Sequence, residues 1–219
     1  SSSRLPGKAL MKIHDKPVVQ YIVESIKAHL PFIKYALVTS THTTDDAIAD
    51  FGSRHGISVI RGELANVAAR FAHAITEFNC DVIFRINGDS PLAPVGLFNL
   101  ALDAMYHSDW DIVTNIQPRT FPPGMSIELI RSETFLQIQP KLIDLSEREH
   151  VTSHFYSYSK QFRILNLRLP CDYSHYHLAV DTLRDLQILE KIIQLMKRPH
   201  WTYPVMELLS LYRRANEIC

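Results

Sequence analysis

The feature that most constrains this chain is a regular alternation of strand and helix patterns over its first 117 residues. Short apolar runs predict strands at 33–39, 57–60, 81–86 and 111–116. Between them, apolar residues at helical spacing predict helices that begin after an N-cap at Asp15, at Thr43, at Leu64 and near Pro94. Strands that are apolar along their whole length are typical of a parallel sheet covered by helices on both faces. The sequence therefore predicts an α/β fold.

The pattern changes after residue 118. A Pro122-Pro123-Gly124 turn precedes a predicted strand at 125–130, and we expect a helix at 146–158, a strand at 162–167 and helices at 183–196 and 204–216. All seven glycines lie at or before Gly124, and no linker rich in Gly or Ser separates the two parts. We therefore expect one domain over 1–219, in which residues 118–219 elaborate the half formed by 1–117.

Composition narrows the class of protein. With 23 Lys and Arg against 23 Asp and Glu, the balanced charge argues against a nucleic-acid partner, and 46% hydrophobic residues exclude bulk disorder. No apolar run reaches the roughly 18 residues that would span a bilayer. Three scattered cysteines indicate neither a disulfide framework nor a metal site, so we expect a reducing, cytoplasmic location.

Three segments contain residues that could bind a phosphate group or a metal ion. The first is Ser1-Ser2-Ser3-Arg4-Leu5-Pro6-Gly7-Lys8, which lacks the P-loop pattern but has the cations and loop N–H groups to bind a polyphosphate. A solvated basic terminus is the alternative. The second is Asn87-Gly88-Asp89 after a predicted buried strand, where Asp89 could bind Mg²⁺ or belong to an ordinary turn. In the third, Val180-Asp181-Thr182, Asp181 is a second metal ligand or the N-cap of the next helix.

Together and in this order, the three segments resemble the cytidylyltransferases that activate sugars as CMP derivatives. The nearest branch is the spore-coat polysaccharide biosynthesis protein F group, related to acylneuraminate and 3-deoxy-manno-octulosonate cytidylyltransferases. Further similar stretches are Arg61-Gly62 with Ala69-Arg70-Phe71, the Phe121-Pro122-Pro123-Gly124 turn, and Glu147-Arg148-Glu149-His150-Val151-Thr152. The similarity runs from Ser1 to about Leu189, most of the chain.

The resemblance implies a three-layer, Rossmann-like nucleotide-diphospho-sugar transferase fold with a mixed, mainly parallel sheet. The family's first, central strand precedes the serine-arginine motif and is missing from this chain. The implied activity is transfer of CMP from CTP to a sugar acid, with release of pyrophosphate, for surface polysaccharide biosynthesis. A homodimer is also implied.

Residue by residue, the resemblance assigns catalysis to Arg4, Lys8 and Asp89, and Mg²⁺ to Asp89 and Asp181. It assigns the sugar pocket to Glu128, Glu149 and His150. It assigns nucleotide binding to a larger set, which comprises Ser2, Ser3, Arg4, Gly7, Lys8, Arg70, Asn87 and Gly88. The family often has Asp where this chain has Ser126, which leaves the sugar specificity open.

Other constellations support different functions. Asp109-Trp110-Asp111 matches the DxD of metal-dependent glycosyltransferases that use nucleotide-sugar donors, although it also fits the edge of a strand. His150 and His154, four apart on a predicted helix, could bind Zn²⁺ with His175 and His177. A third possibility is a relative that keeps the fold and binds a sugar or nucleotide without catalysis.

Overall fold

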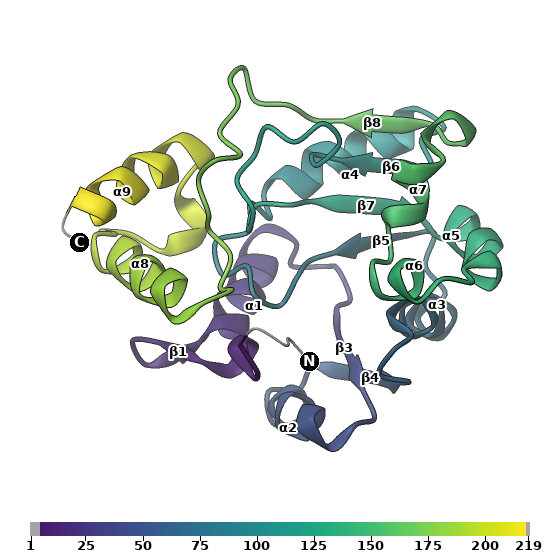
Figure 1. Ribbon diagram of the computed structural model, residues 1–219, viewed down its shortest axis with the longest axis horizontal. Helices are drawn as coiled ribbons and strands as arrows, with labels where there is room; N and C mark the ends of the chain where they lie inside the picture. Colours follow the sequence, from purple (N-terminus) through teal and green to yellow (C-terminus); the bar gives the residue numbers. More distant parts are fainter. Residues whose placement is uncertain (1–4, 218–219) are drawn as a thin grey trace.

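The computed structural model describes residues 5–217, which form a two-stranded hairpin and two further small sheets flanked by helices (Figure 1). The chain starts with the 3-10 turn η1 (Lys8–Leu10), a hairpin of β1 (Lys12–Ile13) and β2 (Lys16–Pro17), and helix α1 (Val18–His29). The prediction that Asp15 caps this helix is wrong, because the cap position is Pro17. Asp15 lies instead in the hairpin turn, where Ile13 pairs with Lys16 and keeps the chain extended up to α1.

The predicted alternation of strands and helices is confirmed, with ends shifted by one to three residues. The elements are β3 (Ala36–Ser40), η2 (Thr43–Asp45), α2 (Asp46–Arg54), β4 (Ser58–Gly62), α3 (Val67–Phe78), β5 (Val82–Arg85), α4 (Leu97–His107) and β6 (Ile112–Thr114). β3 and β4 pair in parallel, as α/β crossovers require. Asn66 begins α3 by accepting a hydrogen bond from the backbone N–H of Ala69 at 3.0 Å.

Beyond residue 118 the sheet acquires a reversed strand. The elements are β7 (Glu128–Arg131), α5 (Ser132–Ile138), η3 (Gln139–Lys141), α6 (Leu145–Glu149), α7 (Ser153–Ser157), η4 (Ser159–Gln161) and β8 (Ile164–Asn166). β7 lies between β5 and β6 and is antiparallel to both, whereas β8 is parallel to β6. The single helix expected at 146–158 is wrong. It is interrupted where Val151 and Thr152 turn into the core, both at most 5% exposed.

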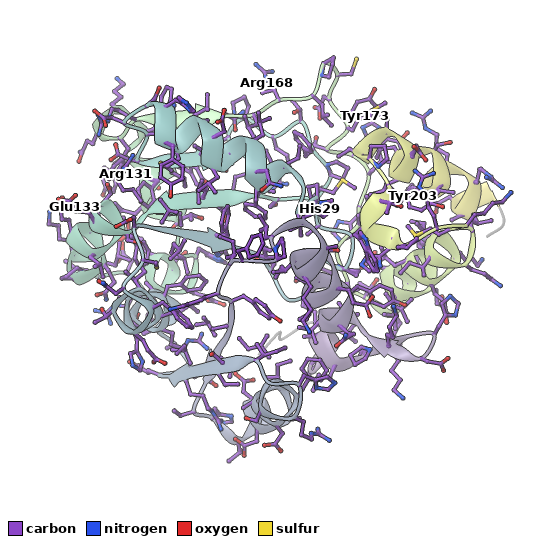
Figure 2. All side chains as sticks on the ribbon, turned by 180° about the vertical axis from the view of Figure 1, so that it is seen from behind. His29, Arg131, Glu133, Arg168, Tyr173 and Tyr203 are labelled. Atoms are coloured by element: carbon purple, nitrogen blue, oxygen red, sulfur yellow. The ribbon has the colours of Figure 1, made fainter. Side chains whose placement is uncertain are left out.

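The C-terminal segment packs back onto the first helix. It comprises α8 (Leu183–Gln194), η5 (His200–Thr202) and α9 (Val205–Glu217). His29, labelled with Tyr203 in Figure 2, places Nε2 2.8 Å from the carbonyl oxygen of Trp201, and His200 Nε2 lies 2.8 Å from the carbonyl oxygen of Tyr21. The ends of the described chain therefore share one apolar cluster, which includes residues from α1, α8 and α9.

Apart from the β1–β2 hairpin, the described strands form two sheets, β3–β4 and β5–β7–β6–β8, and no described strand joins β3 to β5. Between them is a cavity of about 820 Å³, lined by both strands and by apolar side chains of α1 and α3 such as Ile22 and Phe71. In Figure 1, β3 and β4 accordingly stand apart from the larger sheet. Within residues 5–217, no helix is both long and apolar enough to cross a membrane.

The strand directions bring polar groups together at one end of the strands of the larger sheet, which we call the sheet edge. The pairings give β5, β6 and β8 one direction and β7 the opposite one, so the mixed sheet that the family resemblance implies is confirmed. The carboxyl ends of β5 and β6 therefore meet the amino end of β7, where Glu128 lies opposite both Arg85 and Thr114. Ligands of open α/β sheets bind at this edge.

Candidate active site

A lysine lies between two aspartates from distant parts of the chain. Asp89 follows β5 and Asp181 precedes α8, and the backbone N–H of Val180 donates to the carbonyl oxygen of Asp89 at 2.9 Å. Nζ of Lys8 is 2.5 Å from Oδ2 of Asp89 and 2.9 Å from Oδ1 of Asp181. The three side chains are 15–20% exposed. The structure thus brings together three residues that the family resemblance assigns to catalysis and metal binding.

The electrostatics of this trio favour a cation. Burial disfavours the charged form of Lys8, but the hydrogen bonds and charges of the two aspartates outweigh it and raise the pKa of the amine. Two carboxylates and one ammonium leave one negative charge in excess. Mg²⁺ is commonly bound by one or two carboxylates together with substrate phosphates, so this donor set fits Mg²⁺. No group of three or more His, Cys, Asp or Glu within residues 5–217 could hold a metal by itself.

Asp181 does not cap the following helix. Thr182 occupies the N-cap position of α8, accepting from the N–H of Asp185 at 3.2 Å, while the Asp185 carboxylate accepts from the N–H of Thr182 at 2.7 Å. The capping interpretation of Asp181 is therefore wrong. Its carboxylate instead contacts Lys8 and lies 3.3 Å from Nε2 of His177.

The loops on either side of Lys8 and Asp89 hold these side chains in place. Gly7 immediately precedes Lys8 in the left-handed conformation, with φ of 72°, which favours glycine. Asn87 and Gly88 form the link from β5 to Asp89, and the Ser90 hydroxyl donates to Oδ1 of Asp89 at 3.0 Å. Gly88 is not among the left-handed residues. The proposed nucleotide ligands Ser2, Ser3 and Arg4 lie outside the described residues.

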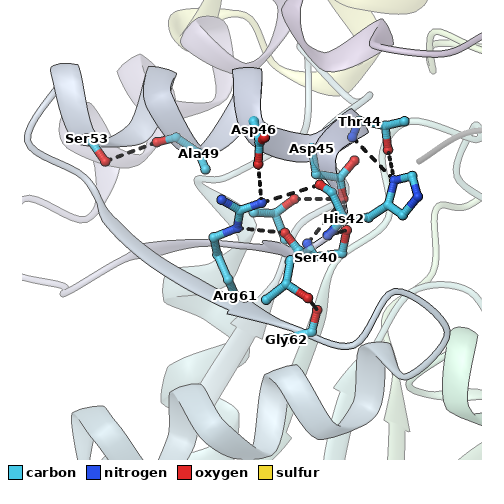
Figure 3. Close-up of polar contacts among 11 residues, drawn as sticks. Ser40, His42, Thr44, Asp45, Asp46, Ala49, Ser53, Arg61 and Gly62 are labelled. Carbon is cyan, nitrogen blue, oxygen red and sulfur yellow. Dashed lines mark hydrogen bonds and ion pairs between the residues drawn. The ribbon is translucent and has the colours of Figure 1, made fainter.

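Asp45 follows β3 and occupies the position just before α2, where its carboxylate binds the end of β3 (Figure 3). Its Oδ2 accepts hydrogen bonds from the Thr39 hydroxyl at 3.0 Å, the Ser40 hydroxyl at 2.6 Å and the Ser40 N–H at 3.1 Å. Burial opposes ionisation of this carboxyl, but the hydrogen bonds from Ser40 outweigh burial and lower its pKa. The loop after β3 is therefore fixed around an ionised carboxylate.

Arg70 faces the same region from α3. The side chain is 7% exposed, and its Nε has no hydrogen-bond partner among the described residues. Burial lowers the pKa of this guanidinium, and the charge of Asp45 partly offsets that effect. Arg70, Asp45, Lys8 and Asp89 all line the cavity. A buried donor without a partner is available to an acceptor on a ligand.

Glu128 forms a second polar cluster at the sheet edge. The carboxylate is 1% exposed; its Oε2 pairs with the Arg85 guanidinium and its Oε1 accepts from the Tyr156 hydroxyl at 2.7 Å. Burial, and then the charge of Glu128, raise the pKa of Tyr156, which keeps this phenol protonated. Arg119 adds a second guanidinium, whose charge interacts with Glu128. Glu128, which the resemblance assigns to the sugar pocket, therefore has both carboxylate oxygens engaged by other side chains.

The structure does not bring Glu149 and His150 to this edge. Both are exposed at the end of α6, and neither has a hydrogen bond or ion pair to Glu128, Asp89 or Asp181 among the described residues. The same Glu-Arg-Glu-His-Val-Thr segment instead leads into α7, which carries Tyr156.

The rival metal motifs have structural roles. Asp111 precedes β6, at the end opposite the site, and accepts from the Thr134 hydroxyl at 2.8 Å and the N–H of Arg163 at 2.8 Å. Arg163 also pairs with Asp109 at 3.2 Å. His154 is 2.9 Å from Glu147, and the described histidines form no zinc cluster. Neither the DxD nor the histidine pairs assemble a metal site.

Comparison with known proteins then decides the family. The family model described as cytidylyltransferase matches residues 1–213. The chain belongs to the cytidylyltransferase family. The chain is therefore a member of an enzyme family. The resemblance drawn from the three sequence segments is confirmed.

The chain is also similar to individual proteins. The chain is similar to an uncharacterized protein of Methanocaldococcus jannaschii, 26% identical over 85% of this chain and 76% of that protein. It is 34% identical to a 3-deoxy-manno-octulosonate cytidylyltransferase of Synechococcus elongatus, but over only 44% of this chain and 39% of the relative. A solved cytidylyltransferase from Leptospira borgpetersenii superposes with a TM-score of 0.90 at 25% identity, covering 99% of this chain and 91% of that one.

A more distant structure supports the fold alone. A CMP:2-keto-3-deoxy-manno-octonic acid synthetase, solved in complex with CTP, matches with a TM-score of 0.63 at 15% identity, over 89% of this chain and 94% of that one. The Rossmann-like nucleotidyltransferase architecture predicted from the sequence is therefore confirmed.

Sequence reasoning missed Arg85, Tyr156 and Arg119. Arg85 and Tyr156 contact Glu128, and the charge of Arg119 interacts with it. The pairing of β5 with β7 that brings Arg85 to Glu128 is not visible in the sequence. One signal was available, since Arg85 and Glu128 both lie in predicted strands and carry opposite charges at positions otherwise apolar.

Proposed function

We propose that this cytidylyltransferase joins CMP from CTP to a hydroxyl of a sugar acid and releases pyrophosphate. The observation that carries the proposal is the contact of Lys8 with both Asp89 and Asp181 at the carboxyl edge of the sheet. The resemblance to 3-deoxy-manno-octulosonate and acylneuraminate enzymes supports the acid acceptor, and it also supports a role in surface polysaccharide biosynthesis and a homodimer.

In the proposed reaction the acceptor oxygen forms a bond to the α-phosphorus of CTP. The bond from that phosphorus to the oxygen of the β-phosphate breaks, pyrophosphate leaves, and the hydroxyl proton passes to solvent. Such transfers need positioning and charge neutralisation more than a covalent role for the protein. The residues therefore act by holding charged oxygens in place.

Each side chain has a role in this scheme. Asp89 and Asp181 would hold Mg²⁺, which would neutralise charge on the phosphate oxygens. Lys8, already paired with both carboxylates, would turn toward the phosphates, with Arg4, Gly7 and the Asn87-Gly88 loop around them. Arg70 would present its unpartnered Nε to the nucleotide. The half formed by 1–117 would thus bind CTP, and residues of 118–219 would bind the acceptor.

The test is turnover of CTP by Asp89→Asn. We expect pyrophosphate release with 3-deoxy-manno-octulosonate or N-acetylneuraminate as acceptor, and a loss of at least about 100-fold in kcat in the variant, since one charged oxygen ligand becomes a neutral amide. Circular dichroism should show an intact fold. Unchanged turnover in the variant would exclude Asp89 from the reaction. Asp109→Asn, which alters an exposed aspartate at the opposite end of the strands, is the matched control.

A further inference from the structure

Each aspartate of the candidate site contacts Lys8 with one carboxylate oxygen and a second side chain with the other. In Asp89, Oδ2 lies 2.5 Å from Nζ of Lys8, while Oδ1 accepts from the Ser90 hydroxyl at 3.0 Å. In Asp181, Oδ1 lies 2.9 Å from the same Nζ, while Oδ2 lies 3.3 Å from Nε2 of His177. We call the oxygens that meet Lys8 the near oxygens and the other two the far oxygens.

The backbone that carries the two carboxylates is fixed independently of these contacts. The carbonyl oxygen of Asp89 accepts from the N–H of Val180 at 2.9 Å, which joins the loop after β5 to the segment before α8. Oδ2 of Asp185 accepts from the N–H of Asp181 at 3.1 Å and from the N–H of Thr182 at 2.7 Å. With both backbones held, the freedom that remains to each aspartate is rotation about its own side-chain bonds.

This rotation decides whether the two carboxylates form one cation site. The ammonium of Lys8 holds the near oxygens together, because it contacts Asp89 and Asp181 at once. In the proposed reaction Lys8 turns toward the phosphates, and two carboxylates left side by side repel each other. A side chain that binds the far oxygen of each aspartate opposes their rotation away from each other.

Ser90 and His177 both act from anchored backbone. Ser90 is 4% exposed; its N–H donates to the carbonyl oxygen of Asn87 at 3.2 Å, and its carbonyl oxygen accepts from the N–H of Ala93 at 3.1 Å. His177 immediately precedes Leu178, which is fully buried. A hydroxyl has one hydrogen to donate, and an imidazole with its hydrogen on Nε2 is likewise a donor at that atom. Each far oxygen therefore faces a donor whose own position is fixed.

We infer that Ser90 and His177 are positioning residues that keep the near oxygens of Asp89 and Asp181 directed at one cation when Lys8 leaves. The inference rests on the proposed function, in which Mg²⁺ takes the place of the ammonium. Loss of a partner that holds a metal ligand typically lowers metal affinity about 10- to 100-fold. The advantage is that the site is formed before the ion arrives, so binding does not have to order the carboxylates.

The experiment measures Mn²⁺ affinity by electron paramagnetic resonance in the full chain carrying Lys8→Met, without nucleotide, so that no ammonium competes with the ion. Mn²⁺ is the probe because, like Mg²⁺, it prefers oxygen ligands. In this background Ser90→Ala and His177→Leu each remove a donor, whereas Ser90→Thr keeps a hydroxyl and His177→Gln keeps an N–H. The matched controls are Ser53→Ala on α2 and His175→Leu, which changes an exposed residue two positions from His177.

Ser90→Ala and His177→Leu should each raise the Kd for Mn²⁺ about tenfold or more, with an intact fold by circular dichroism. The two conservative variants and the two controls should stay within about threefold of Lys8→Met, because they keep both donors. An unchanged Kd in Ser90→Ala or in His177→Leu would overturn the inference and leave the proposed function intact, as would an equal loss in the conservative variants. A Lys8→Met protein that binds no Mn²⁺ would instead refute the metal role of the aspartates in the proposed function itself.

Discussion

Replacing Lys8 by Met tests whether the aspartate pair is a cation site. Methionine is one atom shorter than lysine and removes the ammonium that lies 2.5 and 2.9 Å from the two carboxylates. Breaking a fully buried ion pair by removing one partner costs about 3–5 kcal/mol. At 15–20% exposure water screens the remaining charges in part, so we expect a loss of about 2–3 kcal/mol. For a chain of this size that corresponds to a fall in Tm of roughly 5–10 °C.

The same variant should gain a response to metal. With Lys8 gone, Asp89 and Asp181 repel each other and Mg²⁺ no longer competes with an ammonium. Millimolar Mg²⁺ should therefore restore most of the lost Tm in the absence of nucleotide, and should leave the parent almost unchanged. The assay is thermal unfolding by circular dichroism in EDTA and across a Mg²⁺ series, with Lys12→Met on the exposed face of β1 as control. A variant as stable as the parent in EDTA, or one with the same response to Mg²⁺ as the parent, would refute the reasoning.

Two further predictions concern the scaffold. Burial lowers the pKa of His200, so below about pH 6.5 the unfolded chain binds more protons than the folded chain and the free energy of unfolding falls. His200 should contribute up to about 1.4 kcal/mol of this fall per pH unit, so the free energy of unfolding of His200→Gln, measured by denaturant titration, should fall less steeply than that of the parent between pH 7 and 5. An equal slope in the two proteins would contradict this. A Cβ on Gly124, at φ of 91°, would lie 2.2 Å from the backbone carbon of Leu178, whereas Gly56, at φ of 66°, has open space around it. Gly124→Ala should therefore cost about 2–5 kcal/mol and Gly56→Ala only about 1–2 kcal/mol, and equal losses in chemical denaturation would show that the contact with Leu178 does not matter.

The sequence predicts a helix or strand well where neighbouring residues alone determine it. Strands β3 to β6 are short apolar runs bounded by polar residues and turns, and the structure moves their ends by three residues at most. The reversed direction of β7 was not predictable, because the pattern of a strand does not state its partners. The break between α6 and α7 was missed for a similar reason: Val151 and Phe155 have helical spacing, and tertiary burial of Val151 and Thr152 interrupts the helix.

In the candidate site, too, residues were predictable where a local motif indicates them and not where their role depends on tertiary contacts. Asp89 was predicted because a polar motif at the end of a buried strand indicates a ligand-binding position, and Lys8 was predicted because it ends a loop of cations and hydroxyls. The contact between Lys8 and Asp181 spans 173 positions and was anticipated only through the family resemblance. Arg119 and Tyr156 could not be predicted, since their importance depends on the three-dimensional neighbours of Glu128.

The most direct test of the central claim is a calorimetric titration with CTP and UTP, in Mg²⁺ and in EDTA. The parent and an Asp89→Asn/Asp181→Asn double variant should be compared. The account predicts CTP binding that depends on Mg²⁺, UTP binding at least about tenfold weaker, and loss of the Mg²⁺ dependence in the double variant. Binding of CTP that is equal in Mg²⁺ and EDTA, or a preference for UTP, would contradict it.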